Sequence, residues 1–331
     1  MVKAKAVRIR ESGDADVLDL GELEVRDPGA DEVLVEVAAA GLNRADILQR
    51  RGFYPAPPGV PPDVPGLEYA GTVAAVGPAV RSFAPGDRVM GIAGGGAMAT
   101  HLVAHERELI PVPDGIQLSH AAAIPEVFLT AYDALFLQGG LGIGQVVLVH
   151  AAASGVGTAA IQLADVAGAT VVGTSRTADK LERVRELGLA HGVVAEDGQF
   201  AEAVREATGG RAPEVVLDLV GAAYLPENVK AVAPQGRIVV VGLLGGAKAT
   251  LVMPVLLAKR VRLQGTVLRS RPLEEKAALS QAFTRDVLPL LACGRVRPVV
   301  DTVMPMEQVR DAHRRMESNV TVGKIVLTWA G

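Results

Sequence analysis

The sequence predicts an α/β fold whose centre is a doubly wound parallel sheet. Three observations support this prediction. The run Val146–His150 is short, apolar and rich in valine, as buried strands of parallel sheets are. The charge-free turn Ala151–Gly157 follows, and apolar residues then recur at helical spacing up to Gly168, where a helix can end. A second valine-rich run, Thr170–Thr174, leads into another helical segment, which gives the strand–helix–strand rhythm of a parallel sheet.

The turn after the first strand is suited to a dinucleotide. Small residues let a pyrophosphate approach the backbone, and the first N–H groups of the following helix point at it. The glycine pattern is degenerate, because Ala152, Ser154 and Gly157 stand where three glycines are usual. Small residues also permit close packing of the helix on the strand, so the turn alone leaves both interpretations open.

The end of the second strand indicates which dinucleotide fits. Enzymes that use NAD usually place an Asp or Glu here, which accepts hydrogen bonds from the ribose hydroxyls. This chain has Ser175 and Arg176, with Lys180 one helical turn later. A guanidinium and an ammonium attract a 2′-phosphate, whereas a carboxylate would repel it. The pattern favours NADPH, although Asp179 is a contrary sign and solvated helix-start residues would look the same.

Composition limits the class of protein. A chain of 331 residues predicts two domains. The hydrophobic fraction is 49% and the mean hydropathy is +0.29. The segment Ala134–Ala164 has no charged side chain, but glycines and His150 interrupt it, so a buried strand is favoured over a bilayer helix.

Charge and cysteine content exclude further classes. The formal net charge is −4 and no basic block occurs, so nucleic acid is not an expected partner. The amino-terminal residues lack an apolar signal core, so export is not expected. Cys293 is the single cysteine, which excludes an internal disulfide and a cysteine-rich zinc site. A cytoplasmic location is the simplest prediction, with no membrane association.

Alternation and turn residues predict the elements before the central sheet. Strands are expected at 3–10, 32–38, 71–76 and 87–91, and a short helix at 44–50. The proline-rich segment Tyr54–Pro65 must be a loop, where binding residues are often found. His101 and His105 have helical metal-ligand spacing, but the local pattern alternates as in a strand, so surface or structural histidines are favoured.

The remaining elements follow from similar signals. Ser119 is expected to cap a helix over 121–124, which Pro125 ends, and a second helix is expected over 126–137. Later strands are expected at 215–219 and 238–241, each followed by a glycine-bearing turn that would line the cofactor groove. A last strand is expected at 324–328.

Nearly the whole chain matches one family in register. The matching segments are GLNRADILQRRGFYPAPPG, PGLEYAGTVAAVG, AAAIPEVFLTAYDAL, VLVHAAASGVGTAAIQLA, GRIVVVGLLGG and NVTVGKIVL. Together they resemble the NADPH:quinone oxidoreductase (zeta-crystallin-like) branch of the medium-chain dehydrogenase/reductase superfamily. The resemblance implies a GroES-like, partly β-barrel catalytic domain formed by both termini, residues 1–125 and 266–331. It also implies an NADP-binding Rossmann domain at 126–265.

The resemblance also implies chemistry without zinc. Zinc alcohol dehydrogenases of the superfamily place a cysteine where this chain has Asn43 and a histidine where it has Leu67. Neither residue here offers a thiolate or imidazole ligand, and the lobe of four structural cysteines is missing. No metal is therefore expected.

Site residues are carried over position by position. Asn43 and Tyr54 are the implied catalytic residues at the nicotinamide end. The implied cofactor-binding residues are Thr130, Ala152, Ser154, Gly155, Val156, Gly157, Ser175, Arg176, Lys180, Gly242, Leu243, Leu244, Gly245, Leu268, Asn319 and Lys324. One departure is Ala195, which stands where relatives often carry a tyrosine near the adenine.

The implied reaction is hydride transfer from NADPH to a quinone. Asn43 and Tyr54 would donate hydrogen bonds to the oxygen that gains charge, since a phenol with a pKa of about 10 is protonated at neutral pH. Loop packing for Tyr54 and a turn hydrogen bond for Asn43 are the structural alternatives. An enoyl-thioester or alkenal reductase of the same fold, and an NADPH-binding protein without an enzymatic role, remain the functional alternatives. A zinc alcohol dehydrogenase is the least favoured.

An assembly is also implied. The segment Ala249–Val267 is strongly apolar and includes the strand-like Arg260–Val267. A strand near this position pairs across a two-fold axis in relatives, so a homodimer is expected, and an internal sheet strand is the alternative. The expected partner is otherwise a small quinone or another electrophilic substrate.

Overall fold

The computed structural model describes residues 1–329, and the chain divides into two compact units. The terminal unit comprises Met1–Leu129 together with Leu268–Gly331, and the central unit comprises Thr130–Val267. The first boundary falls inside helix α3 (Pro125–Tyr132). Segments from both ends of the sequence therefore build one unit, and the middle of the chain builds the other.

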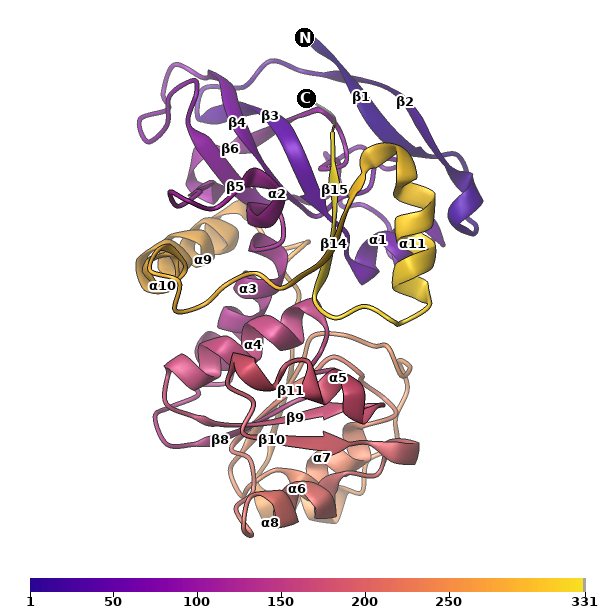
Figure 1. The fold of residues 1–331 in the computed structure, drawn as a ribbon, viewed down its shortest axis with the longest axis vertical. Coiled ribbons are helices and arrows are strands. Elements are labelled where there is room, and N and C mark those ends of the chain that lie inside the picture. Colours follow the sequence, from indigo (N-terminus) through magenta and orange to yellow (C-terminus); the bar gives the residue numbers. More distant parts are fainter. Residues whose placement is uncertain (330–331) are drawn as a thin grey trace. The chain divides into compact units, whose positions relative to one another are not determined.

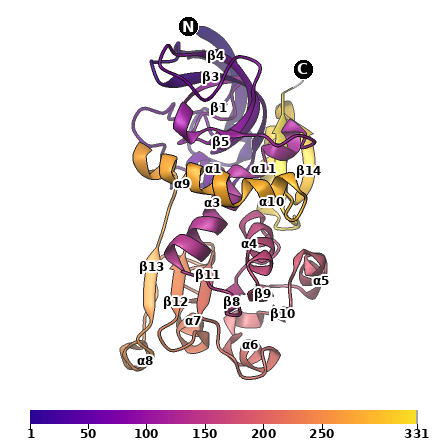
Figure 2. The same ribbon diagram turned by 90° about the vertical axis from the view of Figure 1, so that its left-hand side faces the viewer.

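The central unit is built on a six-stranded sheet in which every pairing is parallel. Its strands are β8 (Val146–Val149), β9 (Thr170–Ser175), β10 (His191–Val194), β11 (Val215–Asp218), β12 (Arg237–Val240) and β13 (Arg262–Gly265). Its helices are α4 (Gly155–Val166), α5 (Ala178–Glu182), α6 (Ala201–Ala207), α7 (Leu225–Ala231) and α8 (Met253–Lys259). The strand order is β10-β9-β8-β11-β12-β13, as Figure 2 shows. Helices α4 and α5 cover one face and α6, α7 and α8 the other (Figure 1), which confirms the predicted doubly wound sheet.

Burial explains why valine-rich runs form the middle of this sheet. All four residues of β8 are shielded from solvent, and a strand covered on both faces is apolar along its whole length. Val146 and Leu148 share one core cluster with Val204 of α6 and Val229 of α7. Strand β13, in contrast, is exposed at all four positions and forms an edge of the sheet.

The terminal unit contains the remaining elements. Its strands are β1 (Val2–Ile9), β2 (Leu18–Val25), β3 (Glu32–Gly41), β4 (Glu68–Val76), β5 (Arg88–Ile92), β6 (His101–His105), β7 (Ile110–Pro111), β14 (Val300–Pro305) and β15 (Lys324–Thr328). Its helices are α1 (Arg44–Arg50), α2 (Leu118–Ala121), the first part of α3, α9 (Leu273–Asp286), α10 (Leu288–Ala292) and α11 (Val309–Glu317).

Strand β3 organises the terminal unit. One edge of β3 pairs with β4, and the other pairs with β6 over its first half and with β15 over its second half. The sheet path β14-β15-β3-β4-β5-β7 is open, since β14 and β7 are not paired with each other within the described residues. The partly β-barrel domain that the resemblance implied is therefore an open sheet and not a closed barrel. Strands β1 and β2 form a separate antiparallel pair.

Several boundaries differ from the sequence predictions. Helix α2 spans Leu118–Ala121 with Gln117 before it, so Ser119 lies inside the helix rather than at its cap. Pro125 begins α3 instead of only ending the preceding helix, because proline lacks an N–H that the first helical turn does not need. The predicted helix over 126–137 changes at Asp133 into a π-helical segment, Asp133–Gln138. Within residues 1–329, every helix is too short or too polar to cross a bilayer.

Candidate functional site

The predicted pyrophosphate turn lies between β8 and α4. Ser154 caps α4, and its Oγ accepts a hydrogen bond from the N–H of Gly157 at 3.0 Å. A Cβ built on Gly157 would lie only 2.5 Å from the carbonyl oxygen of Ala151, so this position requires glycine. The N–H of Ala152 is donated to Thr174 of β9 at 2.9 Å, which fixes the turn on the sheet. Gly155 and Val156 open the helix, where backbone N–H groups have no intrahelical acceptors.

Three predicted phosphate-binding residues lie at the end of the neighbouring strand. Ser175 is the last residue of β9, and its Oγ accepts a long hydrogen bond of 3.4 Å from the N–H of Thr177. Arg176 is exposed, and Lys180 lies on α5. No carboxylate ends β9, so a 2′-phosphate would meet positive charge at this strand end.

The turns after β11 and β12 form one surface at the carboxyl edge of the sheet. The N–H of Gly245 is donated to Val220 at 2.7 Å, and a Cβ on Gly221 would lie 2.9 Å from the Leu243 side chain. Leu243 and Leu244 are 58% and 56% exposed. The turn predicted at 242–245 is therefore an accessible apolar surface next to the turn that follows β11.

Four buried polar side chains, His150, Thr174, Asn228 and Asp218, are joined by hydrogen bonds near the same edge of the sheet. His150 Nε2 lies 2.6 Å from Asn228 Oδ1, and His150 Nδ1 lies 2.8 Å from the hydroxyl of Thr174. The Asn228 amide nitrogen donates to Asp218 Oδ2 at 2.9 Å, so Asn228 presents its oxygen to a protonated Nε2 of a neutral imidazole. Burial lowers the pKa of His150 to about 4. This row of hydrogen bonds connects the ends of β8, β9 and β11 to α7.

Three polar residues of the terminal unit are in contact where their strands begin or end: Lys324 begins β15, Glu68 begins β4 and Asn43 follows β3. Lys324 Nζ donates to the carbonyl of Leu42 and to Asn43 Oδ1, and it forms an ion pair with Glu68 Oε1, each at 2.6 Å. Asn43 Nδ2 donates to Glu68 Oε1 at 2.9 Å and to the carbonyl of Gly41 at 3.2 Å. Lys324 and Glu68 are buried.

These contacts differ from the roles predicted for two residues. Lys324 was expected to bind the cofactor, but its ammonium group makes two hydrogen bonds and an ion pair within the terminal unit. Asn43 was expected to donate to substrate, but both of its amide protons have acceptors within the unit. The geometry makes both residues part of an internal cluster, which we name the Lys324 cluster (Asn43, Glu68 and Lys324).

Tyr54 lies beside an arginine that sequence reasoning missed. The Arg269 guanidinium carbon lies 4.8 Å from the centre of the Tyr54 ring, and Arg269 also donates to the Tyr54 carbonyl at 3.0 Å. Arg269 is fixed further by Gln49 Oε1 at 2.6 Å and by the carbonyl of Gly94 at 2.7 Å. The Tyr54 ring is half-buried, and the structure gives its hydroxyl no hydrogen-bond partner among the described residues.

Two carboxyl groups next to the Lys324 cluster have raised pKa values. Asp46 is fully buried and accepts hydrogen bonds from the N–H groups of Asn43 and Gly66, and its burial raises its pKa to about 6. Desolvation of the Glu126 carboxyl group is the larger cause, and the negative charge of Glu68 the second, of a rise in its pKa to about 8. The backbone N–H of Glu126 is donated to Glu68 Oε2 at 2.9 Å. Glu126 is therefore a protonated carboxylic acid at neutral pH. Sequence reasoning missed this residue, and its position within the apolar run IPEVFL was the one signal that could have indicated it.

The remaining predicted residues come from four different segments of the chain. Thr130 lies on α3, where the central unit begins, and Leu268 is buried where the chain returns to the terminal unit. Asn319 follows α11 with a φ of 58°, and its Oδ1 accepts a hydrogen bond from Arg44. Ala195 is buried, and its N–H is donated to Ser175 at 2.9 Å.

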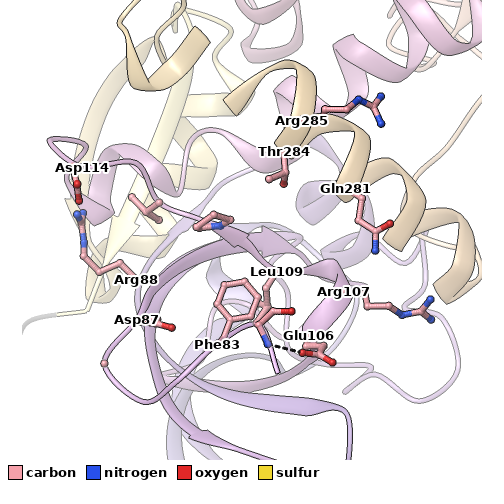
Figure 3. A pocket seen from close by; sticks show the side chains of 14 residues that line it. Phe83, Asp87, Arg88, Glu106, Arg107, Leu109, Asp114, Gln281, Thr284 and Arg285 are labelled. Atoms are coloured by element: carbon pink, nitrogen blue, oxygen red, sulfur yellow. Dashed lines mark hydrogen bonds between the residues drawn. The ribbon is translucent and has the colours of Figure 1, made fainter. Parts of the chain in front are cut away.

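A groove of about 760 Å³ occurs elsewhere in the terminal unit (Figure 3). Phe83 and Leu109 line it, and Gln281, Thr284 and Arg285 face it from α9. None of the residues predicted for catalysis or cofactor binding lines this groove. Within residues 1–329, no three His, Cys, Asp or Glu side chains are grouped so that they could hold a metal ion.

Comparison with known proteins identifies the family. Residues 29–114 match the alcohol dehydrogenase GroES-like domain, and residues 155–284 match the zinc-binding dehydrogenase family. The mouse quinone oxidoreductase-like protein 2 is 30% identical over 312 residues, which cover 94% of this chain and 89% of that protein.

Two solved structures extend the comparison. The Escherichia coli quinone oxidoreductase complexed with NADPH has a TM-score of 0.87 at 28% identity and covers 98% of this chain and 99% of its own. The CurK enoyl reductase has a TM-score of 0.88 at 28% identity and covers 99% of this chain and all of its own. The GroES-like expectation is thus confirmed, and the chain belongs to the quinone oxidoreductase branch of the medium-chain dehydrogenase/reductase superfamily of oxidoreductases.

Proposed function

We propose that the protein is a zinc-independent, NADPH-dependent quinone reductase. The observation that supports it most directly is the Lys324 cluster. The superfamily's zinc enzymes would place metal ligands at residues 43 and 67, whereas here an ammonium group takes the acceptor atoms of Asn43 and Glu68. Leu67 is buried and offers no donor atom to a metal. The Lys324 ammonium group is therefore the cation in the Lys324 cluster, and the protein itself supplies it.

The choice of NADPH rests on the end of β9. Ser175, Arg176 and Lys180 offer a hydroxyl and two cations to a 2′-phosphate. The pyrophosphate would lie on the turn from Ala152 to Gly157, because the free N–H groups of the α4 start favour anions. Bound NADPH would supply a hydride to the substrate.

Tyr54 is the donor that we assign to the substrate oxygen. Its hydroxyl is uncommitted, and burial raises the pKa of the phenol, so it stays protonated and able to donate. The Arg269 guanidinium fixes the Tyr54 ring and places a positive charge beside it. A donor aimed at developing negative charge lowers the barrier without reorganising during the reaction.

The reduced quinone also needs a proton, and Glu126 is the group that we propose to supply it. A two-electron reduction of a quinone by hydride requires one further proton to give the hydroquinone. Glu126 keeps its proton to a pH of about 8, and Asp46 and Glu68 beside it disfavour its ionisation. Exchange with solvent would then reload the carboxyl group.

The second candidate function is reduction of a carbon–carbon double bond in an enoyl thioester or alkenal. It is favoured by the likeness to the CurK enoyl reductase. In that reaction the hydride goes to a β-carbon, and the same Tyr54 hydroxyl would face the thioester oxygen. NADPH binding without turnover is the third candidate.

We also propose that the protein is a homodimer in the cytoplasm. Strand β13 pairs with β12 on one side, and within residues 1–329 no strand pairs with its outer side. Leu257, Leu263 and Val267, on or near this strand, are 69%, 42% and 49% exposed. Such an edge pairs readily with a second copy. A single, exposed free cysteine suits a reducing compartment. Light scattering that gives a monomer at micromolar concentration would contradict the dimer.

The test is the rate of NADPH and NADH oxidation in chelator-treated buffer, with ortho- and para-quinones and an enoyl thioester as acceptors. Faster turnover of quinones with NADPH than with NADH would support the proposal. Turnover confined to the thioester would support the second candidate, and tight NADPH binding with no turnover would support the third. Dependence of the rate on added zinc would contradict the metal-free assignment.

Tyr54→Phe tests the proposed donor, and Tyr69→Phe is its matched control. Removal of one charge-stabilising donor typically raises the barrier by roughly 2.7–4 kcal/mol, and the electrophilic quinone reduces this, so we expect kcat to fall about tenfold. Tyr69 is fully buried with a hydroxyl that has no partner, so its loss should leave kcat unchanged. Equal kcat values for both variants would remove Tyr54 from the mechanism.

A further inference from the structure

Three aromatic rings pack together at the carboxyl edge of the central sheet. The His150 ring centre lies 4.7 Å from that of Phe200 and 4.9 Å from that of Tyr224, and the last two are 5.0 Å apart. These distances are typical of edge-to-face and tilted aromatic pairs. His150 and Phe200 are buried, whereas Tyr224 is only partly buried. Tyr224 is therefore the solvent-facing member of the group.

The Tyr224 ring is fixed before any ligand arrives. His150, on which it packs, is held by hydrogen bonds to Thr174 and Asn228. On another side, a Cβ built on Gly198 would lie 3.9 Å from Tyr224 Cε1, so the loop after β10 runs beside the ring. A preorganised aromatic face loses little side-chain entropy when a ligand binds to it.

The ring also lies at the same edge of the sheet as the proposed phosphate site, because Arg176 follows β9, Tyr224 follows β11, and both strands pair in parallel with β8. Burial raises the pKa of the Tyr224 phenol, and the Arg176 guanidinium opposes that rise, so the two side chains interact electrostatically. The other aromatic residues of the central unit are Tyr132 and Phe136, which pair with each other before β8, and the buried Phe200. Tyr224 is thus the aromatic residue that combines exposure with proximity to Arg176.

We propose that Tyr224 is the surface on which the adenine base of the cofactor stacks, beside the 2′-phosphate at Arg176. The inference rests on the proposed binding of NADPH and adds a residue to it. An adenosine joined to a phosphate at Arg176 carries a flat aromatic base within a few ångströms of that phosphate. A tyrosine face recognises such a base by stacking and needs no hydrogen bond to its edge.

The test measures binding of adenosine 2′,5′-bisphosphate and of nicotinamide mononucleotide by calorimetry. Loss of one aromatic–base stack costs about 1–3 kcal/mol, so Tyr224→Leu should bind the bisphosphate about 5- to 150-fold more weakly. Tyr224→Phe keeps the ring and should stay within about twofold of the wild type. Nicotinamide mononucleotide lacks adenine, so its affinity should be the same for all three proteins.

Each outcome decides the inference. Equal affinity of Tyr224→Leu and wild type for the bisphosphate overturns the role of Tyr224 and leaves NADPH binding standing. A wild type that does not bind the bisphosphate overturns both proposals. Equal weakening of both ligands by Tyr224→Leu marks general damage to the unit and also counts against a stacking role.

A second variant gives a readout that does not depend on a loss of affinity. Tyr224→Trp adds an indole to a chain whose single tryptophan is Trp329. Stacking predicts that the bisphosphate quenches the added emission, measured against the wild type, while nicotinamide mononucleotide does not. Emission that neither ligand changes would contradict the inference even if Tyr224→Leu failed to fold.

Discussion

Replacing Lys324 by methionine should destabilise the terminal unit strongly. Lys324 Nζ lies 2.6 Å from Glu68 Oε1, and the two side chains are 4% and 0% exposed. Methionine keeps the length of the side chain but leaves Glu68 buried without the cation that touches it. Removal of one partner of a buried ion pair costs about 3–5 kcal/mol. We therefore expect the free energy of unfolding to fall by about 3–5 kcal/mol.

The chain offers a matched control for this change. Lys230 and Glu227 are also 2.6 Å apart, but the Lys230 side chain is 62% exposed. The Glu227 side chain is only 8% exposed, but it also accepts hydrogen bonds from the backbone N–H groups of Phe200 and Ala201 and keeps them when Lys230 is replaced. An ion pair whose cation is solvated contributes about 0–1 kcal/mol, so Lys230→Met should have a small effect. The difference between the two variants separates burial from the ion pair itself.

Urea unfolding followed by tryptophan fluorescence is the assay. Trp329 is the single tryptophan, and its backbone N–H donates to the carbonyl of Ala38 in β3, so its emission reports on the sheet that holds Lys324. A second variant that adds Glu68→Gln to Lys324→Met removes the stranded charge and should recover more than half of the loss. If Lys324→Met and Lys230→Met shift the unfolding free energy equally, the buried Lys324–Glu68 pair contributes no more to stability than a pair with a solvated cation.

Three further perturbations follow from the geometry. Arg176→Ala removes a charged hydrogen-bond donor worth about 1.5–3 kcal/mol. In steady-state assays the KM for NADPH should therefore rise about 10- to 150-fold, while the KM for NADH stays unchanged. Equal changes in the two KM values would refute the role of Arg176 in binding the 2′-phosphate. Gly157→Ala places a Cβ 2.5 Å from a backbone oxygen, so it should abolish detectable NADPH binding in calorimetry, and retained affinity would show that the turn is adaptable. Glu126 has a raised pKa of about 8 in the folded protein. The unfolded chain therefore loses this proton first, and wild-type stability should fall, relative to Glu126→Gln, by at most about 1.4 kcal/mol per pH unit from pH 4.5 to 8. Parallel stability–pH curves for the two proteins would contradict the protonated carboxyl group.

The central unit was largely predictable from local signals. Valine-rich runs such as Val146–His150 have the periodicity of buried parallel strands, and Ser154 is a side chain that caps a helix. Each of these signals lies within a few residues of the element that it predicts. The end of β9 at Ser175 and the turn after β12 could be placed for the same reason.

The polar clusters were not predictable in the same way. Asn43 and Lys324 are 281 residues apart in the sequence, and nothing near either residue indicates the other as its partner. Resemblance to a family placed both at the site, but only the structure shows that they bind each other. Arg269 likewise lies 215 residues from Tyr54, and its contact depends on how the chain returns to the terminal unit.

The pairing of β15 with β3 has a consequence for how the chain folds during its synthesis. The central unit, Thr130–Val267, is one continuous stretch of sequence, so all of its residues are available as soon as that stretch has been made. Strand β3, in contrast, pairs with β4 on one edge, but the other edge of its second half must wait for residues 324–328. Until then the buried faces of the amino-terminal strands remain exposed to other nascent chains and to chaperones. Strand β3 is thus a segment at risk of aggregation for as long as residues 324–328 have not yet been made.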